Sequence, residues 1–192
     1  MDLNVYQEKV CTADVIGSVP MYPIADITAT VGEISDIWTN WILSSVHGGS
    51  DWEVTSTKLT EKIRTIWLEI AVFAHLLDVP LEFIYYYACP DKFSDGKNTC
   101  YYVPRLAAAV GRLNKVWSKH LKRHEYALPD LEAIAKENLS NPTTFRAKLT
   151  SECIIILHII IKLGALLNLD LNEVLSDQLD ELEKREPISS AK

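Results

Sequence analysis

Four acidic side chains in the first half of the chain have the types and spacing to hold a divalent cation. Glu33 and Asp36 are three residues apart, and Glu61 and Glu69 lie four residues on either side of Thr65. In a helix, spacings of three and four place side chains on one face. Mg²⁺ prefers several carboxylate oxygens together with water and substrate phosphates. If the two faces meet, these carboxylates would hold one Mg²⁺; the alternative is that Asp36 and Glu61 are solvated surface residues.

A row of basic residues in the second half indicates phosphate binding without a metal. Arg112, Lys115 and Lys119 are three and four residues apart. Arginine forks and lysine point charges both neutralise phosphate. We therefore expect this row to contact a nucleotide or another phosphorylated small molecule. The alternative is that Arg112 and Lys115 form salt bridges with acids of the first half and take the place of a metal. Those acids are Glu33, Asp36 and Glu61.

The segments that would position both sets of side chains occur twice in the chain. Residues 29–38 align with residues 108–117, and residues 76–82 align with residues 166–172. The apolar positions, a glycine and a tryptophan agree, whereas the charges at matched positions reverse. A repeat that keeps its packing positions but reverses its charges indicates a retained fold with an altered site.

Apolar residues recur at helical spacing along most of the chain, without strand-like alternation of useful length, and this pattern predicts an all-α fold. The predicted helices cover residues 4–17, 24–46, 57–77, 81–88, 104–124, 128–139, 143–167 and 173–184. Asp170 or Asn172 can cap the last of them. We expect a first module over residues 1–95 and a second over residues 96–192. Each would be a pair of long antiparallel helices with a short partner, and two pairs make a four-helix bundle, a pseudo-dimer in one chain.

The most apolar run, residues 153–167, is interrupted by His158 and Lys162. The run is shorter than the roughly 20 residues that a membrane span needs. We therefore expect a buried core helix and no membrane association. The two polar residues either project into a ligand cleft or mark the polar edge of the bundle, with the lysine reaching outward to solvent.

Four short segments also keep an order and spacing found in a known enzyme family. They are Leu3-Asn4-Val5-Tyr6-Gln7-Glu8, Tyr22-Pro23, Val31-Gly32-Glu33-Ile34, and Ile66-Trp67 to Leu81-Glu82. This series resembles the all-α nucleoside triphosphate pyrophosphohydrolases of the MazG type. The resemblance covers about residues 3–88, and more weakly residues 103–184.

The resemblance implies hydrolysis of a nucleoside triphosphate to a monophosphate and pyrophosphate. It also implies Mg²⁺ held by a Glu-x-x-Glu pattern on one helix and a Glu-x-x-Asp pattern on the next. In the first module Glu33 matches, but Thr30 replaces the other Glu of its pattern, and Lys62 and Thr65 replace the second pair.

The second module departs from the same patterns in a similar way. Ala109 and Arg112 replace the first pair, whereas Glu152 matches and Ile155 replaces the aspartate. One ligand of four in each module is not a metal site of the family's kind, so hydrolysis by the family mechanism is not expected.

Charge and cysteine content limit the remaining classes of function. The net charge of −7 argues against generic nucleic-acid binding, although residues 96–150 carry ten basic and four acidic residues. The four cysteines show no metal spacing and indicate reduced thiols in a cytoplasmic protein; the alternative is a disulfide between Cys89 and Cys100. The cysteines are Cys11, Cys89, Cys100 and Cys153.

Together these patterns favour a catalytically degenerate MazG-like protein that sequesters a nucleotide or acts as a regulatory pseudoenzyme. It would need no cofactor, and Arg112, Lys115 and Lys119 would contact phosphate; self-association is left open. One alternative is an active Mg²⁺-dependent pyrophosphohydrolase that uses Glu33, Asp36, Glu61 and Glu69. A second alternative is a helical protein-interaction module without a ligand.

Overall fold

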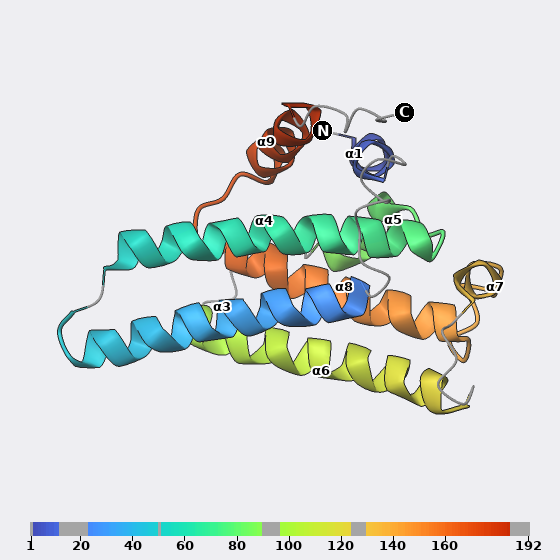
Figure 1. The fold of residues 1–192 in the computed structure, drawn as a ribbon, viewed down its shortest axis with the longest axis horizontal. Coiled ribbons are helices and arrows are strands. Elements are labelled where there is room, and N and C mark those ends of the chain that lie inside the picture. Colours follow the sequence, from blue (N-terminus) through green and yellow to red (C-terminus); the bar gives the residue numbers. More distant parts are fainter. Residues whose placement is uncertain (1, 12–22, 50, 90–96, 124–129, 185–192) are drawn as a thin grey trace, which may run out of the picture.

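Four long helices lie side by side in a bundle, with shorter helices around them (Figure 1). The computed structural model describes residues 2–11, 23–49, 51–89, 97–123 and 130–184, and over these residues the fold is all-α, as predicted. The long helices are α3 (Pro23–Val46), α4 (Trp52–Leu76), α6 (Thr99–Arg123) and α8 (Phe145–Leu166). The short helices are α1 (Leu3–Val10), α5 (Leu81–Ala88), α7 (Leu131–Ala135) and α9 (Leu171–Lys184).

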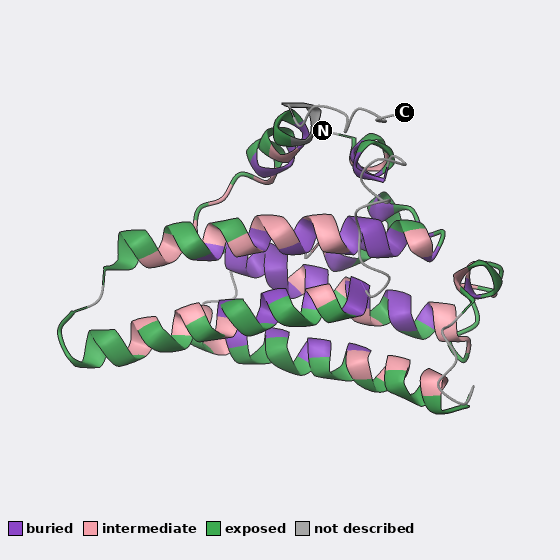
Figure 2. Ribbon diagram, viewed as in Figure 1, coloured by how far each residue is buried: buried purple, intermediate pink, exposed green. Residues whose placement is uncertain are grey.

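The long helices form two antiparallel hairpins that cover each other's apolar faces. α3 packs on α4 and α6 packs on α8, while α3 also contacts α6 and α4 contacts α8. Ile27, Ile66, Leu106 and Leu157, one from each long helix, are all fully buried. Buried residues line the inside of the bundle, whereas the ends of α3 and α4 nearest their connecting loop are largely exposed (Figure 2). One core therefore spans both predicted modules.

Each short helix that follows a hairpin reaches across to the other half. α5 follows α4 in the chain but packs mainly on α8, and α9 follows α8 but packs on α1 and α4. These crossings interlock the two halves, so neither half buries its apolar surface alone.

The turns that launch α5 and α9 have the same backbone geometry. Asp78 and Asn168, which occupy matched positions of the repeat, have φ values of 53° and 56°. The next residue in each turn donates its backbone N–H five residues back, from Val79 to the Ala74 carbonyl at 2.9 Å and from Leu169 to the Gly164 carbonyl at 3.0 Å. This left-handed helix cap is a Schellman-type turn. Gly is preferred at its left-handed position, and Asn and Asp adopt that conformation less often. The aligned segments therefore adopt one local structure twice.

Several predicted helix boundaries need correction. α4 begins at Trp52, five residues before the predicted start, because the Asp51 carboxylate accepts the backbone N–H groups of Glu53 and Val54. The predicted helix over residues 128–139 is only Leu131–Ala135 among the described residues. The first helix ends at Val10, and the rest of its predicted range, residues 12–17, lies outside the described residues. Asp170 rather than Asn172 caps α9, accepting a backbone N–H at 2.8 Å.

The predicted core helix is confirmed as α8, but the expectation for its two polar residues is wrong in part. Lys162 is buried, with 4 % of its surface exposed, rather than reaching outward to solvent. The Nδ1 atom of His158 lies 2.8 Å from the Ala88 carbonyl oxygen at the end of α5. Among the described helices, α8 alone is long and apolar enough to cross a membrane, and 61 % of its most apolar stretch is buried inside the bundle.

Arg146, in the first turn of α8, fastens the second half to the end of α4. Its Nε atom donates to the Leu77 carbonyl at 2.8 Å, Nη1 donates to the Glu137 carbonyl at 3.1 Å, and Nη2 donates to the Asp78 carbonyl. The two acceptors in the first half are carbonyls at the C-terminal end of α4, which lack helical partners of their own. One guanidinium therefore satisfies three backbone groups from both halves.

We predict that Arg146→Met lowers the free energy of unfolding by about 2 kcal/mol or more, because it leaves part-buried carbonyls without donors. Lys148→Met is the matched control, since this exposed side chain bonds, among the described residues, only the nearby Thr143 carbonyl. Urea unfolding followed by circular dichroism measures both. Equal stability of the two variants would contradict the role given to Arg146.

Candidate functional site

A polar pocket of about 430 Å³ lies on the seam between α3 and α4. We call it the α3–α4 pocket. Its polar lining residues come from one face of each helix, because their spacings of three and four repeat along one side. They are Asp26, Thr30 and Glu33 from α3, and Lys62, Thr65 and Glu69 from α4. Its apolar lining residues are Pro23, Ala29, Leu68 and Val72.

An ion pair joins the two helices at this pocket, and its counterpart in the second half has the opposite polarity. The Lys62 ammonium contacts the Glu33 carboxylate. At the matched positions, the Arg112 Nε atom lies 3.1 Å from the Glu152 carboxylate. Each hairpin therefore has one carboxylate facing one cation. The carboxylate lies on the first helix of the first hairpin (α3) but on the second helix of the second hairpin (α8). The alternative in which Arg112 pairs with an acid of the first half is wrong, since its partner Glu152 belongs to its own hairpin.

Glu69 is a carboxyl group of the pocket whose pKa lies well above its ordinary value. Thr30 donates its hydroxyl hydrogen to Glu69 Oε1 at 2.6 Å, while the buried Oε2 atom has no hydrogen-bond partner among the described residues. The pKa of Glu69 is raised to about 7, mainly by burial. The Thr30 hydrogen bond and Lys62 lower this pKa, whereas the carboxylates of Asp26 and Glu33 raise it. Near neutral pH this group can therefore either accept or donate a proton.

The structure brings together part of the predicted acidic set. Glu33 and Glu69 line the α3–α4 pocket, but Asp36 and Glu61 do not belong to its lining. Across the part of the chain that the structure describes, no three His, Cys, Asp or Glu side chains come together in a group that could hold a metal.

The residues present do not fit a magnesium site of the kind that the family resemblance implies. Two of the four expected ligand positions hold the neutral hydroxyls of Thr30 and Thr65, and a third holds the ammonium of Lys62, which already contacts Glu33. A lysine ammonium at a carboxylate takes the place of a metal cation rather than helping to bind one.

The predicted basic row lies on α6. Lys115 and Lys119 are exposed and form no ion pair with a described residue, whereas Arg112 is held by Glu152 through Nε. The guanidinium has five N–H donors, and among the described residues its contact with Glu152 uses Nε rather than the Nη atoms.

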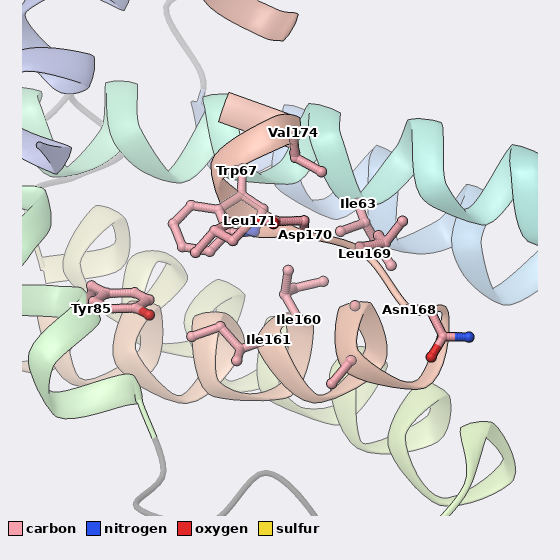
Figure 3. A pocket seen from close by; sticks show the side chains of 12 residues that line it. Ile63, Trp67, Tyr85, Ile160, Ile161, Asn168, Leu169, Asp170, Leu171 and Val174 are labelled. Carbon is pink, nitrogen blue, oxygen red and sulfur yellow. The ribbon is translucent and has the colours of Figure 1, made fainter. Parts of the chain in front are cut away.

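A second and larger cavity, of about 500 Å³, lies between α4 and α8 near the start of α9 (Figure 3). Trp67 and Ile63 border it from α4, and Ile160 and Ile161 border it from α8. Its acidic lining residue, Asp170, already caps α9. We therefore take the α3–α4 pocket as the candidate site for polar chemistry, although the cavity between α4 and α8 is larger.

Sequence reasoning missed Asp26 and did not foresee the ion pair of Lys62. The signal was present in the spacing, since Asp26, Thr30 and Glu33 lie four and three residues apart. The ion pair of Lys62 has no such signal, because spacing within one helix does not show which helical faces meet.

Comparison of the chain with protein-family models, curated proteins and solved structures finds no match.

We predict that the stability of the protein falls as the pH rises from 4.5 to about 7, with Glu69 as a main cause. Over this range the folded chain keeps a proton on Glu69 that the unfolded chain loses, because the folded pKa is the higher one. Glu69→Gln should remove this dependence and be more stable than the wild type above pH 7, on the order of 2 kcal/mol. Urea unfolding at a series of pH values measures the free energy of unfolding of the wild type and of Glu69→Gln. Identical pH profiles for the two proteins would refute the role given to Glu69.

A second prediction concerns the ion pair. Glu33→Lys and Lys62→Glu should each destabilise the protein by about 0.5 to 1 kcal/mol, because each places like charges together. The double variant has the polarity of the Arg112–Glu152 pair and should recover most of the loss. Additive losses in this double-mutant cycle would show that the two side chains do not interact.

Proposed function

We propose that this chain is a MazG-like, catalytically degenerate protein that binds a nucleotide, either to sequester it or as a regulatory pseudoenzyme. The proposal includes a tandem arrangement, in which the α3–α4 and α6–α8 hairpins are two diverged copies of one module. The matched turns at Asp78 and Asn168 and the reciprocal packing of α5 and α9 support that arrangement.

The observation that carries the loss of catalysis is the ion pair in each hairpin. Opposed acids on two helices repel each other unless a cation lies between them. Lys62 supplies that cation at Glu33, and Arg112 supplies it at Glu152. Magnesium-dependent hydrolysis needs the metal to bridge protein carboxylates and substrate phosphates. With the cation built into the chain, the carboxylates are neutralised and the metal's coordination sites are lost.

The basic row on α6 is the proposed phosphate site. Lys115 and Lys119 offer two exposed ammonium groups, and Glu152 holds Arg112 beside them. Arginine can bind two phosphate oxygens at once, while lysine acts as a point charge. Binding of this kind requires no divalent cation.

We predict that reversing both lysines, in a Lys115→Glu/Lys119→Glu variant, weakens nucleotide binding by at least about tenfold, because two charge-assisted contacts become repulsive. Isothermal titration with ATP, GTP, CTP and UTP measures this. Lys58→Glu is the control, since Lys58 is an exposed lysine on α4 of the other hairpin.

Unchanged affinity in the double variant would place the nucleotide elsewhere. Absence of heat with every nucleotide would contradict the proposal and favour a protein-interaction module.

A further inference from the structure

The apolar stripe of α3 continues beyond the part of the bundle that covers it. Its residues recur every three or four positions, so they lie along one side of the helix. They are Ile27, Val31, Ile34, Trp38, Ile42 and Val46. The first three are buried, Trp38 and Ile42 are half-buried, and Val46 is 76 % exposed. Exposure therefore rises toward the end of a stripe that begins in the shared core.

The stripe of α4, the second helix of this hairpin, becomes exposed at the same end. Leu59 and Ile63 are buried, whereas Trp52, seven residues before Leu59 on the same side, is 41 % exposed. The α3–α4 hairpin extends past the ends of α6 and α8 (Figure 1), and this part of it is largely exposed (Figure 2). We call this part the overhang and define it as residues 37–49 and 51–58.

The α3 side of the overhang lacks the charges that the solvent-facing side of a helix ordinarily carries. No Asp, Glu, Lys or Arg occurs from Ile37 to Ser50, although these residue types make up 23 % of the chain. The corresponding stretch of α6, at the same offset in the repeat, carries Lys119, Lys122 and Arg123. The overhang also holds three of the chain's five tryptophans. Few charges and many aromatic residues are typical of the core of a protein–protein interface.

We propose that the overhang is the contact through which two copies of this chain form a homodimer. A two-fold symmetric contact brings each surface against its own duplicate, so a charge near the axis meets the same charge. An uncharged apolar surface meets this requirement, whereas the basic end of α6 does not. The stripe is also continuous with the side of α3 and α4 that α6 and α8 cover within the chain. Two overhangs would therefore cover each other as the two hairpins do inside one chain.

Charge and size narrow the kind of contact further. An uncharged surface offers no electrostatic attraction to a nucleic acid or to an anionic membrane. The α3 part that lies in the overhang is about 15 Å long, at 1.5 Å of rise per residue. We therefore expect a small interface and a dissociation constant in the micromolar range. The overhang does not include the basic row on α6, so this inference goes beyond the proposed nucleotide binding.

Sedimentation-velocity centrifugation of the whole chain at about 1 to 200 μM tests the inference, since this range brackets a micromolar dissociation constant. We expect the sedimentation coefficient to rise with concentration from that of a monomer to that of a dimer. Val46→Glu should weaken dimerisation by at least about tenfold, because it buries a carboxylate in an apolar contact. Val46 is exposed in the single chain, so the substitution should leave the fold intact.

Ser44→Glu is the matched control, because it adds the same charge to the same exposed helix end. Ser44 is two residues from both Ile42 and Val46, which places it roughly 200° around the helix from each of them. We expect this variant to dimerise as the wild type does. Far-ultraviolet circular dichroism verifies the helical content of both variants.

Three results of the centrifugation would overturn the inference. They are a monomer at every concentration, unchanged dimerisation of Val46→Glu, and equal weakening by Val46→Glu and Ser44→Glu. Co-sedimentation of a monomeric chain with phosphatidylcholine vesicles would also overturn it, and would assign the overhang to a lipid surface. None of these outcomes bears on Lys115 and Lys119, so nucleotide binding is judged separately.

Discussion

The structure depends on one constraint: a two-helix hairpin has an apolar face that must be covered, and here each hairpin covers the other. α3 and α4 cannot bury Ile27 and Ile66 without α6 and α8, and the short helices α5 and α9 cross over to close the ends. Because the apolar faces turn inward, polar residues lie at the edges where the two helices of a hairpin meet, and there they contact each other. This is how Glu33 comes to face Lys62, and Arg112 to face Glu152.

The two ion pairs are better understood as charge compensation than as a source of stability. The side chains of Lys62 and Glu33 are 35 % and 53 % exposed, so the pair contributes at most about 1 kcal/mol to folding. Without Lys62, however, the carboxylates of Asp26, Glu33 and Glu69 would share one pocket with no cation among its described lining residues. The charge of Glu69 remains uncompensated: burial raises its pKa to about 7, and its Oε2 atom has no partner in the part of the chain that the structure describes.

Much of the fold could be predicted from the sequence, because the long helices carry regular apolar spacing and the turns carry recognisable cap residues. α5 was predicted with its bounds, whereas α4 was predicted too short because the capping role of Asp51 was not considered. The site was harder to predict. Spacing shows which residues share a helical face, but not which faces meet, so Asp36 and Glu61 were grouped with Glu33. The burial of Lys162 likewise depends on neighbouring helices that periodicity cannot reveal.

In the proposed function, cations of the chain itself replace the metal used by MazG-type enzymes, and nucleotide binding persists without it. The most direct measurement is calorimetric titration with nucleoside triphosphates in Mg²⁺ and again in EDTA, with pyrophosphate release followed in parallel samples. Binding that survives EDTA, without pyrophosphate release, is the result that this account predicts. Binding that requires Mg²⁺ and is accompanied by pyrophosphate release would contradict it, and would show that the carboxylates near Glu33 hold a working metal.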